Sequence, residues 1–130
     1  MKKTILAAVA LATLVTAPAY AQRSCLEFGQ IYNWNALDNR TLIVEDNWHN
    51  KFRMALMGDC PGLTFKERVG FKSMGATSMS CMSAGDDVII RNFGTGGQRC
   101  PIRQIVPYTA ELQKADADAA AAKKAAQDQH

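Results

Sequence analysis

The sequence predicts a mainly β fold: a small antiparallel barrel or roll of about six short strands, with at most one short helix and with two disulfides. Two observations lead to this fold class. Short stretches of alternating apolar and polar residues are separated by turn-forming glycine, proline, asparagine and aspartate residues. The chain also holds four cysteines, and disulfides commonly support small domains whose apolar core is marginal.

Residues 31–56 are typical of three antiparallel strands joined by two hairpin-type connections. The polar residues 38–40 form the first connection, and residues 46–50 form the second. The third strand, residues 51–57, alternates as a strand with one buried face does. Its apolar face carries Phe52, Met54 and Leu56, and its opposite face carries Lys51, Arg53 and Ala55.

The second half of the domain continues with short elements that are separated by turns. Residues 63–70, which follow a Pro-Gly turn, are predicted to form one short helical turn. Its apolar contacts are expected to be Leu63, Phe65 and Val69. Three further strands are predicted at residues 78–82, 87–91 and 98–106.

The first 21 residues predict a signal peptide. Two lysines precede a short apolar run at residues 5–15, and Ala19-Tyr20-Ala21 fits the small-residue rule for cleavage after Ala21. The apolar run is too short to cross a bilayer of roughly 30 Å as a helix, and no later segment is long or apolar enough. We therefore expect a periplasmic or secreted protein without a membrane span.

Residues 22–108 are then predicted to form one disulfide-stabilised β domain, followed by an alanine-rich polar tail at residues 109–130. The tail has no large apolar residue after Leu112, so it is expected to be disordered or partly helical. Without Lys2 and Lys3, the 15 basic residues fall to 13 against 12 acidic residues. This near balance argues against a nucleic-acid or anionic-membrane partner.

The four cysteines predict two structural disulfides, because an even number in a small exported domain is typical of that use. Three pairings are open. We favour the nested one, Cys60–Cys81 with Cys25–Cys100, which would clip the segment after the third strand and tie the first strand to the last. A zinc site would need closely spaced ligands, and a thiol–disulfide active site would need C-x-x-C; the sequence has neither pattern.

Three methionines close to one cysteine raise the alternative of a copper site, because thioether and thiolate ligands suit Cu(I). The set would be Met74, Met79, Met82 and Cys81. No histidine accompanies it, so the competing prediction is that Met79 and Met82 fill gaps in the core beside a disulfide. We accordingly expect no metal and no cofactor.

The sequence contains no group of residues that forms a recognisable catalytic motif. Asp86 and Asp87 would point to opposite faces at the start of a strand, so they predict a turn rather than an acid–base pair. Residues 93–99 are glycine-rich but lack the lysine and helix of a phosphate-binding loop. Trp48 and His49 lie in a polar turn, where an exposed tryptophan predicts a contact surface.

Several motifs, taken in order, resemble those of a known family. They are Ile31-x-x-Trp34 after the first cysteine, LDNRTLIV at 37–44, CPGL at 60–63, Cys81-x-x-x-Gly85-Asp86, and the RCxIxxI-type segment at 99–105. Together they resemble a family of small exported bacterial proteins of unknown function. The resemblance implies a compact, disulfide-bearing domain behind a signal peptide, with a variable tail. It implies no activity, cofactor or catalytic residue.

These observations predict a non-catalytic binding or structural domain of the bacterial cell envelope, whose partner is an unknown protein or an envelope ligand. The sequence shows no convergent set of catalytic groups, which argues against an enzyme; a hydrolase or a thiol-dependent activity is the rival class. Two other hypotheses stay open: a periplasmic copper-handling protein and an inhibitor of a secreted enzyme.

Overall fold

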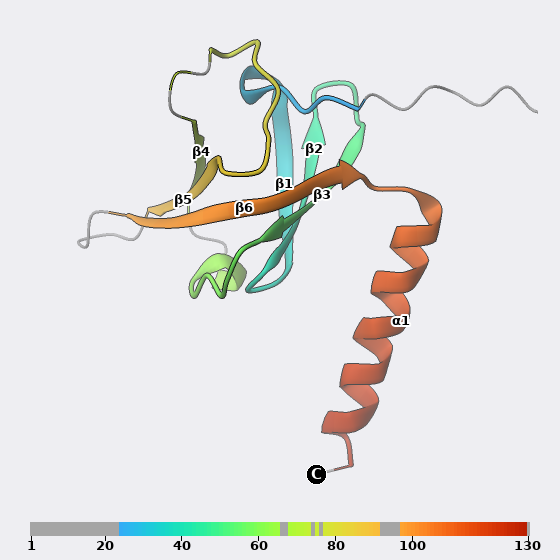
Figure 1. The fold of residues 1–130 in the computed structure, drawn as a ribbon. Coiled ribbons are helices and arrows are strands. Elements are labelled where there is room, and N and C mark those ends of the chain that lie inside the picture. Colours follow the sequence, from blue (N-terminus) through green and yellow to red (C-terminus); the bar gives the residue numbers. More distant parts are fainter. Residues whose placement is uncertain (1–23, 66–67, 74, 76, 92–96, 130) are drawn as a thin grey trace, which may run out of the picture.

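The computed structural model describes residues 24–65, 68–73, 75, 77–91 and 97–129, and it shows a mainly β fold. Six antiparallel strands form one curled, half-barrel sheet in the order β1-β2-β3-β6-β5-β4 (Figure 1). The elements are η1 (Phe28–Gln30), β1 (Ile31–Asp38), β2 (Thr41–Asp46), β3 (Lys51–Leu56), η2 (Leu63–Phe65), β4 (Arg68–Lys72), β5 (Asp87–Arg91), β6 (Gln98–Pro107) and α1 (Ala110–Gln127). The predicted fold class is confirmed.

The first three strands form the predicted meander, and their inward side chains build the core. Leu42 pairs with Met54, and Val44 lies between Trp34 and Phe52 in register. Phe52, Met54 and Val44 are fully buried, so the alternation expected for the third strand is observed. Burial of this one face fixes the register, because a slip by one residue would expose every apolar side chain.

The long strand β6 connects the two halves of the sheet (Figure 1). Residues 98–101 pair with β5, and residues 102–107 pair with β3. The register shifts between Ala55 and Leu56, opposite the point where β6 passes from one neighbour to the other. Irregularities of this kind increase local bend and twist, which accounts for the curl of the sheet at β6.

The prediction for residues 63–70 is wrong in its second half. Leu63 is buried in the short helix η2, but Val69 belongs to strand β4, which pairs with β5. Phe65 is 77% exposed and makes no core contact of the kind expected. The alternation of Arg68 to Lys72 prevails over the local turn propensity, because it puts Val69 and Phe71 against the core.

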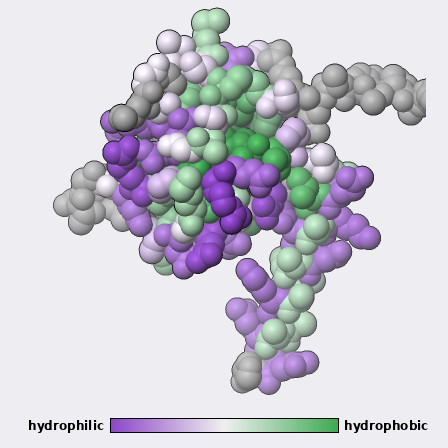
Figure 2. All heavy atoms as spheres, in the orientation of Figure 1, coloured by the Kyte–Doolittle hydropathy of each residue, from purple (hydrophilic) through white to green (hydrophobic). Residues whose placement is uncertain are grey.

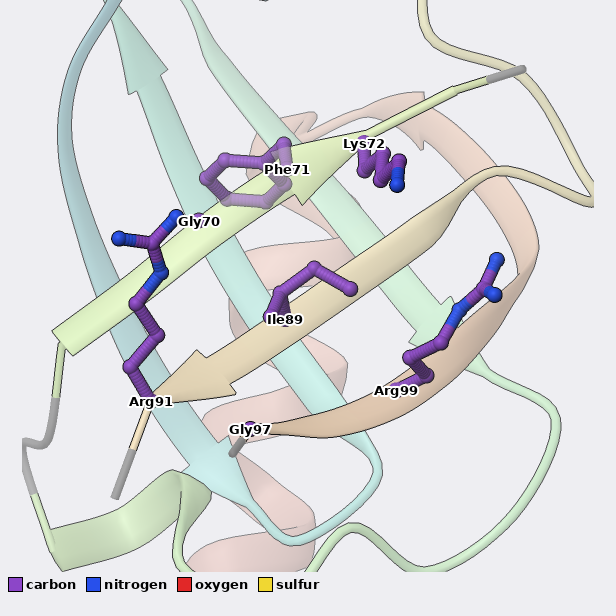
Figure 3. Close-up of a pocket in the computed structure, with 7 residues that line it drawn as sticks. All are labelled: Gly70, Phe71, Lys72, Ile89, Arg91, Gly97 and Arg99. Atoms are coloured by element: carbon purple, nitrogen blue, oxygen red, sulfur yellow. The ribbon is translucent and has the colours of Figure 1, made fainter. Parts of the chain in front are cut away.

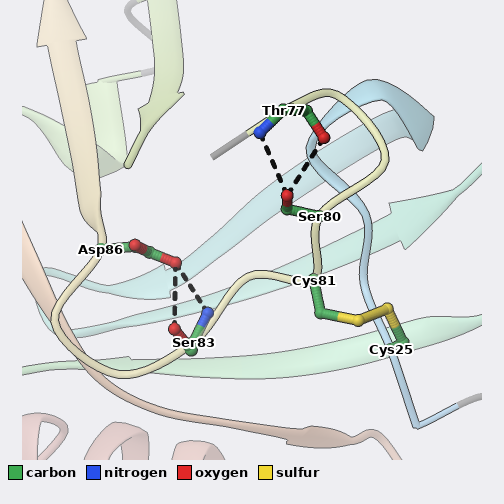
Figure 4. The surroundings of a disulfide bond; sticks show 6 residues. All are labelled: Cys25, Thr77, Ser80, Cys81, Ser83 and Asp86. Atoms are coloured by element: carbon green, nitrogen blue, oxygen red, sulfur yellow. Dashed lines mark hydrogen bonds between the residues drawn. A yellow bond between two sulfur atoms is a disulfide. The ribbon is translucent and has the colours of Figure 1, made fainter. Parts of the chain in front are cut away.

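The prediction of a strand at residues 78–82 is also wrong. Thr77 and Ser80 bond to each other instead: the Thr77 N–H donates to Ser80 Oγ at 3.0 Å (Figure 4). Hydroxyl side chains that bond locally compete with strand pairing. The segment still contacts η1, where the Gly29 N–H donates to Ser78 O at 2.8 Å. A side chain at Gly29 would lie 2.9 Å from that oxygen, so the approach requires glycine.

The structure pairs Cys25 with Cys81 and Cys60 with Cys100, so the predicted nested pairing is wrong. The Cα atoms of the two pairs are 5.3 and 6.0 Å apart. The N-terminal segment lies against residues 80–82, where a bridge joins Glu27 to Cys81 (Figure 4). Cys60 follows β3, the neighbour of β6, which brings it close to Cys100. The disulfide pairing therefore follows from which segments lie side by side in the folded chain, and not from the order of the cysteines in the sequence.

The tail forms one continuous helix, α1, which is the helical alternative of the prediction. Thr109 caps its start by accepting a hydrogen bond from the Leu112 N–H at 3.3 Å. Alanine favours the helix, yet none of its residues is buried. Figure 2 shows hydrophilic and weakly hydrophobic residues along the visible side of α1. Polar contacts rather than an apolar stripe therefore attach it to the domain.

The main polar contact of α1 is the ion pair between Arg53 of β3 and Asp116. Arg53 Nε donates to Asp116 Oδ2 at 2.9 Å, and Arg53 Nη2 donates to Oδ1 at 3.1 Å. These hydrogen bonds lower the pKa of Asp116 below its ordinary value, although partial burial opposes the shift. The pKa of Tyr108, beside them, is raised by burial and by its hydrogen bond to Asp116.

We expect α1 to be released from the sheet in acid. A carboxyl whose pKa is lowered by folding stabilises the folded state when ionised, so its contribution is lost as the pH falls below about 4. Asp116→Asn imitates the protonated form at neutral pH. It should speed hydrogen exchange of the α1 amides about fivefold, since a partly exposed ion pair contributes about 1 kcal/mol. Asp118→Asn, at an exposed position of the same helix, is the control, and equal effects would contradict the account.

None of the helices in the described part of the chain has the length and apolar character needed to cross a membrane. The predicted signal peptide, residues 1–21, lies outside the described residues. The two disulfides fit an extracellular or periplasmic protein.

Candidate functional site

Strands β4, β5 and β6 present a cationic outer face. Alternation along each strand places apolar side chains inward, where Val88, Ile90 and Ile102 are fully buried. The outward positions of the three strands carry most of the local charge. Their basic residues are Arg68, Lys72, Arg91, Arg99 and Arg103, and their acidic residue is Asp87. A chain with a nearly balanced total charge therefore concentrates positive charge on one half of its sheet.

A hollow of about 620 Å³ lies beside this face (Figure 3). It is formed by β4, β5 and the start of β6. The lining residues are Gly70, Phe71, Lys72, Ile89, Arg91, Gly97 and Arg99. Cations and apolar or glycine residues alone make up this set.

The strand register determines how the hollow is arranged. Gly70, Ile89 and Arg99 are neighbours across the three strands. Because Gly70 has no side chain, the peptide backbone of β4 is accessible beside Ile89. A Cβ added at Gly70 would lie 4.0 Å from the Ile89 carbonyl oxygen, which is ordinary contact. Glycine is therefore not required by the fold at this position, and its absence of a side chain leaves the hollow open.

The charged groups of the hollow differ in how they are paired. Arg99 donates to Asp87 through Nε at 3.0 Å and also through Nη2. Among the described residues, no hydrogen bond or ion pair engages the side chain of Lys72 or of Arg91, and both residues are exposed. Unpaired cations that flank a concave surface favour a negatively charged ligand. The charged groups among the described lining residues are all cations, and groups of this kind can bind an anion.

The predicted contact surface at Trp48 and His49 lies elsewhere, at the turn between β2 and β3. Asp46, only 1% exposed, builds this turn by accepting hydrogen bonds from the Trp48 N–H and the Asn50 N–H, each at 2.9 Å. The turn holds His49 at a φ of 66° and leaves Trp48 49% exposed. A buried carboxylate thus fixes an exposed aromatic residue in place.

His49 is further oriented by two neighbours. Its Nδ1 lies 2.5 Å from Glu45 Oε1, and its ring meets the Tyr32 ring edge-on at 5.2 Å. A register shift in β1 between Ile31 and Asn33 accompanies the placement of Tyr32, and such irregularities re-aim side chains.

Three of the four residues proposed for copper, Met79, Cys81 and Met82, lie in the described part of the chain. Cys81 is oxidised in a disulfide and is no free thiolate. Met82 is buried in the core, as expected, but Met79 is 80% exposed and does not fill a core gap. Met74 lies outside the described residues. Within the described ranges, no group of three or more histidine, cysteine, aspartate or glutamate residues could hold a metal ion.

Asp86 and Asp87 diverge, as the sequence predicts. Asp86 Oδ2 accepts a hydrogen bond from the Ser83 N–H at 2.8 Å and so closes a turn (Figure 4). Asp87 accepts from Arg99 instead. Most of the glycine-rich segment at residues 93–99 lies outside the described residues.

The cationic face was missed from the sequence because part of β4 was assigned to a helical turn. The pattern Arg-Val-Gly-Phe-Lys at 68–72 alternates charged or small residues with apolar ones. This alternation is the sequence pattern from which strand β4 could have been predicted. In a strand it places Arg68, Gly70 and Lys72 on one face and Val69 and Phe71 on the other.

Comparison with known proteins gives a family without an assigned activity. The model of one family, described as a family of unknown function (DUF6491), matches residues 1–128. No curated protein and no solved structure matches the chain.

Proposed function

The chain belongs to the family of unknown function DUF6491, and on the evidence of its surface we propose that it is an exported, non-catalytic binding domain of the bacterial cell envelope. Its ligand is anionic and occupies the hollow on the cationic face of β4, β5 and β6. The observation that carries this proposal is a pair of cations, Lys72 and Arg91, whose side chains have no partner among the described residues and which flank the open surface at Gly70 and Ile89.

The charge distribution supports an anionic ligand despite the near balance of the whole chain. A nearly neutral total gives little long-range attraction, but a local cluster acts within about 8–10 Å at physiological salt. The Asp87 carboxylate neutralises part of the positive charge through Arg99. Lys72 and Arg91, whose side chains have no partner among the described residues, can contact a ligand.

The compartment is part of the proposal. Two disulfides together with the predicted signal peptide at residues 1–21 favour the periplasm or the cell exterior. Envelope polymers and lipid headgroups are rich in anionic groups, so such a ligand is available there. Because the disulfides constrain the unfolded chain, they also support a small core in this environment.

One observation favours a second candidate function, an inhibitor or other partner of a secreted protein. Exposed tryptophan in a rigid turn is typical of the centre of a protein interface, and Asp46 makes the turn at Trp48 rigid. Trp48→Ala should abolish binding to such a partner while leaving anion binding unchanged. The two functions are therefore separable by one substitution.

The anionic-ligand proposal predicts loss of binding when both flanking cations are removed. With dextran sulfate as the probe at low ionic strength, Lys72→Gln combined with Arg91→Gln should weaken binding at least about tenfold, since each exposed ion pair contributes up to about 1 kcal/mol and the two together up to about 2 kcal/mol. Isothermal titration calorimetry measures this change. Lys51→Gln combined with Lys124→Gln removes the same charge from other surfaces and should have little effect.

Gly70→Val tests whether binding needs the open space of the hollow, because it fills that space and leaves the charge unchanged. The new side chain fits the fold and suits a strand, so it should preserve or raise stability while filling the open surface. Weaker binding of dextran sulfate by this variant is expected. If both the double variant and Gly70→Val bind as the unaltered protein does, the ligand site lies elsewhere and the proposal fails.

A further inference from the structure

We propose that the cationic face takes an extended polyanion that engages both ends of the hollow at once. The inference rests on the proposed function and specifies its ligand class: a linear chain of repeating anionic groups such as an anionic glycan or a polyphosphate. A single compact anion is the rejected class.

The two unpaired cations lie at opposite ends of the hollow. In the strand register, Arg91 is opposite Arg68 and Lys72 is opposite Asp87. Positions 68 and 72 are four residues apart on β4, which corresponds to about 13 Å at the rise of an extended strand. Figure 3 shows the charged heads of Lys72 and Arg91 at opposite ends. A single small anion would have to draw both side chains inward to contact them together, whereas an extended ligand meets them where they lie.

The middle of the hollow carries no unpaired charge. Gly70 and Ile89 occupy the row between the two ends, and Arg99 in that row is already bonded to Asp87. Ile89 is half-buried and apolar. A ligand that fits this face therefore has anionic groups separated by a less charged stretch, or it repeats its charge along an extended backbone. Both descriptions fit a linear polymer better than one isolated group.

The two ends of the hollow differ in how strongly they are expected to bind an anion. Asp87 is the register partner of Lys72 and the ion-pair partner of Arg99, so it reduces the positive charge at the Lys72 end. At the other end, the register partner of Arg91 is a second arginine, Arg68, rather than an acid. The guanidinium of arginine also binds oxyanions through two parallel donors, which lysine does not. Loss of Arg91 should therefore weaken binding more than loss of Lys72.

Nucleic acid is the less favoured polyanion for this face. Sites for single-stranded nucleic acid combine positive charge with aromatic rings on which bases stack. Phe71 is the one aromatic residue among those lining the hollow, and it packs against the core. A chain that offers charge without planar bases matches the lining more closely.

The test compares three phosphates of increasing length against the full mature chain: orthophosphate, tripolyphosphate and a long-chain polyphosphate. Simultaneous contact with two ends makes the second contact intramolecular, so affinity per phosphate should rise at least about tenfold from tripolyphosphate to the long chain. Lys72→Gln and Arg91→Gln should each reduce the long-chain affinity several-fold, with Arg91→Gln the larger. Lys124→Gln, with the same charge change on α1, is the control.

Three results would overturn the inference. Affinity per phosphate that is the same at every length would show that one anion suffices. An effect confined to one of the two variants would show that only one end is used. Tighter binding of an oligothymidylate with the same number of charges would place the ligand among nucleic acids. In each case an anion still binds, so the proposed function stands; it fails if none of these probes nor dextran sulfate binds.

Discussion

Replacing Cys60 and Cys100 together by alanine is expected to lower the free energy of unfolding by about 5 kcal/mol. The two residues are 40 positions apart, and closing such a loop contributes about 4 kcal/mol in the chain-entropy model. Both residues are buried in the core, so the removal of two sulfur atoms also leaves a cavity that costs about 1 kcal/mol or more. Urea denaturation of the oxidised proteins measures the difference.

The second disulfide provides the matched control. Cys25 and Cys81 are 56 positions apart, so their loss removes a similar entropic contribution of about 4 kcal/mol. Cys81 is exposed and Cys25 is only half-buried, so little packing is lost with them. The Cys60/Cys100 variant should therefore be the less stable of the two. A larger loss from Cys25→Ala with Cys81→Ala would contradict this account of the core.

Replacing Phe52 by alanine is expected to cost about 4 kcal/mol, the usual range for deleting a large core side chain. Phe52 is fully buried and belongs to the cluster that joins β2, β3 and β6. Its loss opens a cavity at the centre of the curled sheet, where the neighbouring strands cannot collapse without shifting register. Thermal or urea denaturation of the purified protein measures the change.

A second phenylalanine serves as the control for this substitution. Phe65→Ala makes the same chemical change at a side chain that is largely exposed, so it should alter the free energy of unfolding by no more than about 0.5 kcal/mol. Comparable losses from the two variants would mean that Phe65 is covered in solution by another part of the chain or by a partner.

Much of the fold could be predicted because patterns within one short segment, such as the alternation of apolar and polar residues, determine where strands and turns form. The alternation from Lys51 to Leu56 has one solution that buries the apolar face, and the observed β3 follows it. The turns at residues 39–40 and 47–50 follow from their polar composition. The strand predicted at residues 78–82 is wrong because Thr77 and Ser80 bond locally through their side chains. The helical turn predicted at residues 63–70 is wrong from Arg68 onward because the edge strand β4 depends on its pairing with β5, which is distant in sequence.

The disulfide pairing could not be derived because it depends on how the halves of the chain fold over each other. Cys25 lies close to Cys81 because a β-bridge joins Glu27 to Cys81. Both segments are irregular, so no alternation of apolar and polar residues in the sequence predicts this contact. Cys60 meets Cys100 because β6 pairs with β3 rather than with β1. Strand order across a sheet is set by packing, and four cysteines are compatible with three pairings.

The candidate site was hidden for a related reason. Counting charge over the whole chain gives near neutrality, and the count carries no information about arrangement. The register brings Lys72, Arg91 and Arg99 around one hollow although they come from three separate segments. By contrast, the turn at Trp48 and His49 is local in sequence, and for that reason it could be singled out before the structure was known.

The central claim, that the cationic face of β4, β5 and β6 is the ligand site, is tested most directly by mapping backbone amide chemical shifts during titration with long-chain polyphosphate. The account predicts that the largest changes occur at Gly70, Lys72, Ile89, Arg91 and Arg99, which line the hollow. Changes that cluster at Trp48 and His49, or along α1, would contradict it.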